Sequence, residues 1–338
     1  MLPGMTPGEL NTMHRDIRAG LRGGVEKAVA LGHALLAARA GLPHGAWLPW
    51  VRKNLDFGGE TARNYASMAG HPDLAARCTS VRQFLRKVRF RRHLDKRREA
   101  AERGRSLHTP DWCALHAVDF RGMPGLLPAG CASLCVADPV WDEGHLGDYA
   151  AIDAAAAALL KPRGVLLVYY SRGHLPAVLA SFRRLRFLDQ LFVVYSAPKQ
   201  LWTTGGMVCR TRPVLAFCQG DRPAKGTYKM HDTQLGTVAG AKEYHKWEQD
   251  EPALRYWAGH FTDPGDTVVD LCVGGGTLAA ACHALKGRTY HGCDTDPAAL
   301  AVTRQRLADL DGRDRLDAAG PGAAAGGLAV GGGPAWVT

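Results

Sequence analysis

The chain has 338 residues and a formal net charge of +10, from 42 Lys and Arg against 32 Asp and Glu. No apolar stretch approaches the roughly twenty residues that a membrane-spanning helix needs, and residues 1–12 lack the basic and apolar parts of a signal peptide. The nine cysteines include no C-x-x-C pair, so we expect reduced thiols and no metal site. The composition therefore predicts a cytoplasmic protein with a sizeable core and a small second domain, and it disfavours a membrane protein.

Helical spacing begins near the amino terminus. Between Leu10 and Leu35, apolar residues recur every three or four positions. This spacing predicts one face of a helix, interrupted only by Gly20, Gly23 and Gly24. Such a face indicates ordinary core packing.

A second helical segment has the pattern of a DNA-binding motif. Residues 45–51 lead to a break at residues 56–59, and a helix is predicted over residues 60–69. Helix, glycine turn and helix form a helix-turn-helix, whose second helix would offer Arg63 and Asn64 to a DNA groove. Simple helical packing or protein docking explains the same pattern, so both interpretations stay open.

The positive charge is concentrated in one segment. Residues 82–105 hold eleven Lys or Arg and three acids, and so carry eight of the ten net positive charges. A helix this basic is predicted to lie along a phosphate backbone, and the candidate DNA contacts are Arg86, Arg89, Arg91 and Arg92. A solvated linker helix between two domains explains the same charge pattern.

A glycine-rich turn marks a candidate cofactor site. Residues 267–271 predict a strand, and the glycine triplet that follows opens a helix of small residues at Thr277. Such a turn lets a ligand approach the backbone at a helix N-terminus. A second strand ends in Asp294, about where a nucleotide site needs a carboxylate for the ribose hydroxyls. On this spacing the ligand could be NAD, although the turn lacks the third glycine of G-x-G-x-x-G, and a turn without a ligand is the plain alternative.

An earlier apolar strand, residues 131–137, ends in Asp138-Pro139-Val140-Trp141. The Asp138 carboxylate and the Pro139 carbonyl can accept the two N–H groups of an exocyclic amine, and the Trp141 ring can stack on a planar base. Alone, such a segment is more often a simple exit from a strand. Together with the glycine turn, it predicts a pocket for an aminated base.

These segments resemble the amino-methylating DNA methyltransferases, which methylate adenine N6 or cytosine N4. The resemblance covers roughly residues 108–310, with the catalytic motif before the cofactor motif, as in the β-type order. It implies a Rossmann-like α/β mixed sheet with helices on both faces, S-adenosylmethionine as the cofactor and double-stranded DNA as the partner. The catalytic residues that it implies are Asp138, Pro139, Val140 and Trp141. The cofactor-binding residues that it implies are Asp270, Leu271, Cys272, Gly274, Gly276, Thr277, Asp294, His245 and Trp247.

Three departures from the family pattern bear on activity. Val140 replaces the usual second proline, which loosens the catalytic loop. Leu271 and Cys272 replace the usual Pro-Phe, which removes an aromatic wall of the cofactor pocket. The segment over residues 220–241 is too short for a separate target-recognition domain. In the family that the chain resembles, the cytosine N4 enzymes more often carry serine at the position of Asp138, so the resemblance favours adenine N6 as the methylated atom.

The complete prediction has four parts. Residues 1–81 form a helical, helix-turn-helix-like domain that also resembles a domain of phage-encoded proteins. Residues 82–107 form a basic linker helix, residues 108–310 the methyltransferase domain, and residues 311–338 a disordered tail. The expected setting is the cytoplasm of a bacterial or phage-infected cell, with a restriction partner and a homodimer left open. The alternatives are cytosine N4 methylation, a DNA-binding protein that kept the fold without turnover, a methyltransferase for RNA or protein amides, and a nicotinamide oxidoreductase.

Overall fold

The computed structural model describes residues 5–20, 23–195, 201–202, 208–221, 229–236, 244 and 248–319. The chain divides into two compact units, Met1–Asp95 and Lys96–Thr338. Among the described residues, no helix has both the length and the apolar character that crossing a membrane requires.

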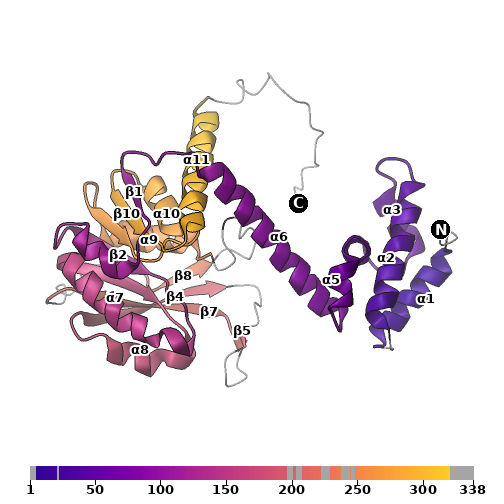
Figure 1. Ribbon diagram of the computed structural model, residues 1–338, viewed down its shortest axis with the longest axis horizontal. Helices are drawn as coiled ribbons and strands as arrows, with labels where there is room; N and C mark the ends of the chain where they lie inside the picture. Colours follow the sequence, from indigo (N-terminus) through magenta and orange to yellow (C-terminus); the bar gives the residue numbers. More distant parts are fainter. Residues whose placement is uncertain are drawn as a thin grey trace. The chain divides into compact units, whose positions relative to one another are not determined.

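The first unit is built from helices, as the apolar spacing predicts (Figure 1). They are α1 (Pro7–Arg18), α2 (Gly24–Ala40), α3 (Trp47–Asn54), α4 (Gly59–Ala69), α5 (Pro72–Ala76) and the first part of α6 (Val81–Gly104). Helices α2 and α4 approach closely at Gly32, where a Cβ would lie 2.0 Å from the carbonyl oxygen of Tyr65. The core between the helices contains fully buried leucines such as Leu31 and Leu35.

The helix predicted between Leu10 and Leu35 is two helices. Gly20 and Gly23 adopt φ angles of +70° and +76°. Residues with a Cβ rarely adopt this left-handed conformation, so the chain can turn between α1 and α2 at these glycines. The apolar positions that predict one helix face are therefore divided between two helices.

The basic segment forms α6, and apolar residues near each of its ends are buried. Phe84 and Val88 lie in the core of the first unit. Ala100 and Ala101 are buried in the second unit, where a Cβ on Gly104 would lie 1.8 Å from the carbonyl oxygen of Ala301. Only the stretch between these ends is exposed over most of its side chains.

The second unit confirms the predicted α/β fold. Its described strands form an eight-stranded sheet in the order β1-β10-β9-β2-β3-β7-β4-β8. They are β1 (Cys113–His116), β2 (Ala132–Ala137), β3 (Leu160–Tyr169), β4 (Arg186–Tyr195), β7 (Thr211–Cys218), β8 (Thr233–Gly236), β9 (Thr267–Asp270) and β10 (Thr289–Cys293), with β5 (Leu201–Trp202) and β6 (Val208–Cys209) as a separate pair. Strands β1, β10, β9, β2 and β3 run parallel, and β7 runs antiparallel to β3 and β4, so the sheet is mixed.

Helices cover both faces of this sheet (Figure 1). They are η1 (Phe120–Gly125), η2 (Glu143–His145), α7 (Leu146–Leu159), η3 (Arg172–His174), α8 (Leu175–Ser181), α9 (Glu251–Phe261), α10 (Thr277–Leu285) and α11 (Pro297–Ala319). Successive side chains of β2 face opposite sides, because side chains alternate along a strand. Leu134 and Val136 pack in the core under α9 and α10, whereas Cys135 and Ala137 pack in the core under α7. All six residues of β2 are buried, and all but Ser133 are apolar, as expected for a strand that is covered on both faces.

The last helix extends past the domain boundary that was predicted at residue 310. Asp296 caps α11 through a hydrogen bond from the Ala298 N–H at 2.9 Å, and the helix runs to Ala319. Residues 311–319 are therefore helical, whereas the predicted tail begins at residue 311. Asp311 lies 2.9 Å from His283 of α10, a contact that holds this extension against its neighbour. The rest of the predicted tail, residues 320–338, lies outside the described residues.

Candidate active site

Two neighbouring parallel strands end side by side. β2 pairs with β9, with Val136 opposite Asp270, so the residues that follow both strands emerge at one edge of the sheet. The chain continues from β2 through α7 to β3, and from β9 through α10 to β10. Because β3 and β10 lie on opposite sides of the β2–β9 pair, the two connections diverge. Divergent connections open a ligand crevice at the carboxyl edge of an α/β sheet.

A cavity of about 520 Å³ lies at this edge. A volume of this size suits a small-molecule ligand. Its wall combines apolar side chains, including Val136, Leu254 and Leu278, with a few acids and the side chain of Arg212.

Most of the predicted catalytic and cofactor residues line this cavity. They are Asp138, Pro139, Val140, Trp141, Asp270, Cys272, Gly274 and Thr277. Three predicted cofactor residues, Leu271, Gly276 and Asp294, are not among the lining residues. His245 and Trp247, the other predicted cofactor residues, lie outside the described residues.

The glycine turn presents backbone to the cavity. Gly274, with a φ of +55°, and Gly275 line the wall. Gly276 faces away from it, because a Cβ at this position would lie 2.7 Å from the side chain of Thr303 on α11. Asp294 holds the turn in place, since one carboxylate oxygen accepts the Gly274 N–H at 2.9 Å and the other accepts the Asp296 N–H at 2.9 Å.

Asp270 is a buried carboxyl group on the cavity wall. It accepts the backbone N–H of Cys272 at 3.1 Å and the hydroxyl of Tyr290 at 3.0 Å. Burial, which penalises the charged form, raises the pKa of Asp270 to about 7, although both hydrogen bonds favour ionisation. The nearby carboxylates of Asp294 and Asp138 raise this pKa further. A cation bound in the cavity would have the opposite effect.

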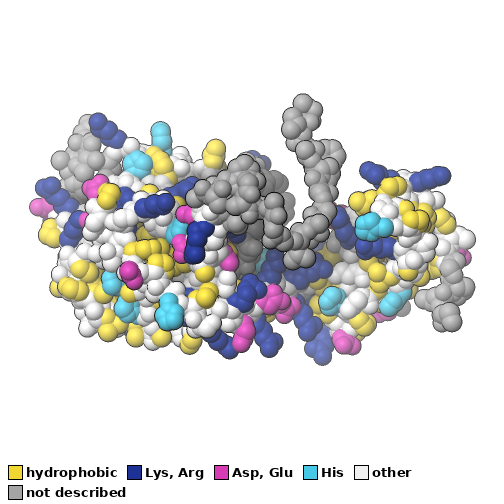
Figure 2. All heavy atoms as spheres, turned by 90° about the horizontal axis from the view of Figure 1, so that it is seen from above, with side chains coloured by type: hydrophobic (Ala, Val, Ile, Leu, Met, Phe, Trp, Pro, Cys, Tyr) yellow, Lys and Arg dark blue, Asp and Glu magenta, His cyan; other side chains and the backbone are white. Residues whose placement is uncertain are grey.

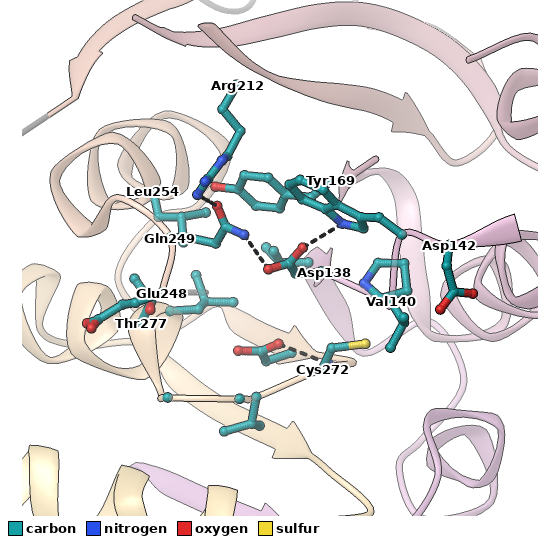
Figure 3. Close-up of a pocket in the computed structure, with 18 residues that line it drawn as sticks. Asp138, Val140, Asp142, Tyr169, Arg212, Glu248, Gln249, Leu254, Cys272 and Thr277 are labelled. Carbon is teal, nitrogen blue, oxygen red and sulfur yellow. Dashed lines mark hydrogen bonds between the residues drawn. The ribbon is translucent and has the colours of Figure 1, made fainter. Parts of the chain in front are cut away.

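Asp138 is held by two donors. The indole N–H of Trp141 donates to one carboxylate oxygen at 3.0 Å, and the side-chain amide of Gln249 donates to the other. The Gln249 carbonyl in turn accepts a hydrogen bond from Arg212 at 2.6 Å. Figure 3 shows the Gln249 amide between Arg212 and Asp138, where the three side chains form one continuous chain of hydrogen bonds.

A buried ion pair supports the glycine turn from the other side. Arg306 lies 2.6 Å from Glu248, and it also donates to the carbonyl oxygen of Gly275 at 3.0 Å. Both side chains of the pair are only 9% exposed, so the charges are largely removed from water. This pair links the segment before α9 to the turn that forms the cavity wall.

The lining residues that were not predicted include four with polar side chains: Tyr169, Arg212, Glu248 and Gln249. All four line the cavity. The signal for Glu248 and Gln249 is their position directly after Trp247, a predicted cofactor residue. Tyr169 and Arg212 carry no local signal, because strand pairing alone brings them to this edge.

The candidate DNA contacts differ in exposure. Arg63 on α4 is exposed, whereas Asn64 is half-buried and lines a cavity of about 640 Å³ inside the first unit. Arg86, Arg91 and Arg92 on α6 are exposed. The side chain of the remaining candidate, Arg89, is outside the described part of the structure. Figure 2 shows Lys and Arg side chains, interspersed with acidic ones, over the course of α6.

The chain was compared with known proteins. No protein-family model matches it, and no curated protein matches it. Solved structures with a similar chain path include M1.HpyAVI in complex with SAM, at 18% identity and a TM-score of 0.47, over 58% of this chain and 98% of that chain. TTHA0409, a candidate DNA modification methylase from Thermus thermophilus, has 17% identity and a TM-score of 0.47, over 58% of this chain and 94% of its own. The cytosine-N4-specific PvuII DNA methyltransferase has 10% identity and a TM-score of 0.46, over 62% and 96%.

Proposed function

We propose that this protein is a DNA methyltransferase that transfers a methyl group from S-adenosylmethionine to the exocyclic amine of a flipped base, with adenine N6 as the methylated atom. One observation carries the proposal. The Asp138 segment and the glycine turn, separated by most of a domain in sequence, line one cavity where β2 and β9 end side by side. The segment that we assign to the amine and the turn that we assign to the nucleotide thus face the same space.

The residues of the catalytic segment have the chemistry that an amine needs. Asp138 and the Pro139 carbonyl would accept the two N–H groups, which draws the nitrogen lone pair out of conjugation with the ring. Trp141 would stack on the base, and its N–H already fixes one oxygen of Asp138. Val140 is 54% exposed, so the residue that replaces the usual proline is not required for packing.

The residues around the glycine turn fit S-adenosylmethionine. When bound, this cofactor supplies an electrophilic methyl group on a positively charged sulfur. The backbone of Gly274 and Gly275 leaves room that a side chain would fill, and Val136 and Leu278 provide an apolar wall. Burial raises the pKa of Asp270 to about 7, and a neighbouring cation would stabilise its ionised form. The turn at the start of α10 presents backbone that suits polar ligand atoms. Asp294 is not among the residues that line the cavity, but it accepts the N–H of Gly274, which is. Its carboxylate has further lone pairs, so we assign the ribose hydroxyls to it.

The test is to incubate the purified protein with unmethylated genomic DNA and S-adenosylmethionine, digest the DNA to nucleosides, and measure N6-methyladenine and N4-methylcytosine by mass spectrometry. We expect N6-methyladenine from the wild type. The Asp138→Ala variant should lose at least about 100-fold in rate, because it removes the acceptor that holds the amine. Asp189→Ala, which changes an exposed acid on β4, is the matched control and should retain the wild-type rate.

The outcomes separate the candidates. N4-methylcytosine in place of N6-methyladenine would replace the target atom and leave the reaction class intact. If the protein binds the cofactor and DNA but yields neither methylated base, the DNA-binding alternative without turnover replaces the proposal. Methyl transfer to RNA or to protein amides, measured in parallel reactions that contain those substrates in place of DNA, would change the substrate class.

A further inference from the structure

The side-chain amide of Gln249 forms hydrogen bonds with both Arg212 and Asp138. Its carboxamide carries an acceptor oxygen and an NH₂ donor on one carbon. Arg212 donates to the oxygen at 2.6 Å, and Asp138 accepts from the NH₂ group. The two cavity residues together therefore match an amine that stands beside a hydrogen-bond acceptor.

Both residues are held in place by other contacts. The guanidinium of Arg212 lies over the rings of Trp141 and Tyr195, with distances of 5.7 Å and 5.9 Å to the ring centroids. Arg212 is 9% exposed. The Trp141 N–H fixes Asp138 from the other side. A donor and an acceptor fixed this firmly favour one edge geometry over others.

Strand pairing explains why these groups meet. Ala137 pairs with Val168, so Asp138 follows β2 beside Tyr169, the last residue of β3. Tyr169 pairs with Val214 of β7, and Arg212 lies two residues before Val214 on the same face. Three neighbouring strands thus place acceptor, phenol and guanidinium in a row along the edge of the cavity.

Tyr169 adds a second donor to this row. Its side chain is fully buried, lines the cavity, and its hydroxyl has no hydrogen-bond partner among the described residues. Burial and the Asp138 charge raise the pKa of Tyr169, so the phenol keeps its proton and can donate. A buried donor that faces a cavity calls for an acceptor on the ligand.

The nucleic-acid bases differ in the edge that they would present here. Adenine has ring nitrogen N1 beside the N6 amine, and cytosine has N3 beside the N4 amine, so both offer an amine next to an acceptor. The amine of guanine stands between the N1–H group, which is a donor, and the ring nitrogen N3, which is an acceptor. A donor from Arg212 therefore matches the Watson–Crick edge of adenine and of cytosine, whereas on that edge of guanine it would meet the N1–H donor.

We propose that Arg212 is a specificity-determining residue, which donates to the ring nitrogen beside the target amine while Asp138 accepts from the amine. A base that enters the site takes the place of the Gln249 carboxamide between them. This inference rests on the proposed function and deepens it. The recognised group is the amidine of the base, which is the target amine together with the neighbouring ring nitrogen that accepts a hydrogen bond.

The experiment uses oligonucleotides that carry the site located in methylated genomic DNA. One oligonucleotide has adenine at the target, and its partner has 1-deazaadenine, which keeps the N6 amine and replaces N1 by a C–H group. The full-length wild type should methylate adenine roughly 10- to 100-fold faster than 1-deazaadenine, as expected for a lost hydrogen bond to a charged donor. Arg212→Met should methylate the two at nearly equal rates. If the genomic assay finds methylated cytosine, 3-deazacytosine takes the place of 1-deazaadenine.

The ratio of the two rates is independent of the amount of folded enzyme, so a partly unfolded variant still reports on specificity. Arg212→Lys, which keeps a cationic donor, should recover part of the preference. Arg210→Met is the matched control, because Arg210 is exposed and close in sequence, and it should keep the wild-type ratio.

Each outcome bears on the inference. A wild type that methylates DNA but does not distinguish the two bases overturns the role of Arg212 and leaves the proposed function standing. An Arg212→Met variant that keeps the wild-type ratio overturns it in the same way. A wild type that methylates no DNA base overturns the proposed function, and the inference falls with it.

Discussion

A single buried acid couples stability to ligand binding at this site. The pKa of Asp270 is raised to about 7, chiefly by burial, whereas an exposed aspartate titrates near 3.8. Between these two pH values the folded protein holds a proton that the unfolded chain releases. The contribution to stability is therefore complete at low pH and is lost as the pH rises through about 7.

We expect Asp270→Asn to remove this dependence. Asparagine can keep the hydrogen bond from Cys272 without carrying a charge, so the free energy of unfolding of the variant should change less between pH 4 and pH 7 and should exceed that of the wild type at pH 8. Urea denaturation at several pH values measures this, with the exposed Asp189→Asn as control. An unchanged pH profile would place the pKa near its ordinary value.

The same carboxyl group should make cofactor binding depend on pH. Because a cationic ligand favours the ionised acid, affinity for S-adenosylmethionine should rise from pH 6 to pH 8 in the wild type and should be weaker in Asp270→Asn. Calorimetric titration at the two pH values measures both effects. Equal affinities at both values would show that Asp270 does not face the cationic end of the cofactor.

At the scale of one element, the conformation of the glycine turn depends on Gly276, the glycine of the triplet that does not line the cavity. Gly276 has a φ of +70°, and a Cβ there would lie 2.7 Å from Thr303. We expect Gly276→Ala to lower the free energy of unfolding by roughly 1–3 kcal/mol, through backbone strain and this clash. Thermal unfolding would show the loss, and Thr303→Ala should restore part of it in the double variant. Full stability of Gly276→Ala alone would argue against close packing of the turn on α11.

Sequence reasoning succeeded where the signal is local. Asp138 and the glycine turn each end an apolar strand, so both could be placed at a strand end before the structure was available. The break between α1 and α2 was misjudged, because an apolar stripe that continues across Gly20 and Gly23 does not reveal that the backbone turns.

The position of Arg212 beside Asp138 could not be predicted in this way. Arg212 reaches Asp138 only through the antiparallel pairing of β7 with β3, a long-range contact without a sequence pattern of its own. The partners of Asp294 were also out of reach, since its contact with Gly274 requires the turn to fold back on β10. Local spacing therefore locates the two motifs, whereas strand order decides which other side chains join them.

At the scale of the whole molecule, α6 concentrates the positive charge. Its exposed arginines include Arg86, Arg91 and Arg92. If each contacts a phosphate, replacing all three by alanine should reduce the salt dependence of DNA binding, log K against log salt, by up to about 3 units. Fluorescence anisotropy across a salt series measures this slope. The control replaces the exposed arginines Arg183, Arg186 and Arg315, and an equal change in the control would show that only total charge matters.

The pairing of β2 with β9 also has a consequence for how such a protein can arise. The two halves of the cavity are joined across the sheet, by bonds such as that from the Leu271 N–H to the Val136 carbonyl oxygen at 2.8 Å, rather than through the intervening chain. A gene rearrangement that moved α9 to α11, with their strands, ahead of β1 would therefore rebuild the same walls in the same places. A bound molecule contacts the folded cavity only, so the order of the two motifs in the chain does not affect its binding. That order can therefore change in evolution while the chemistry of the site is kept.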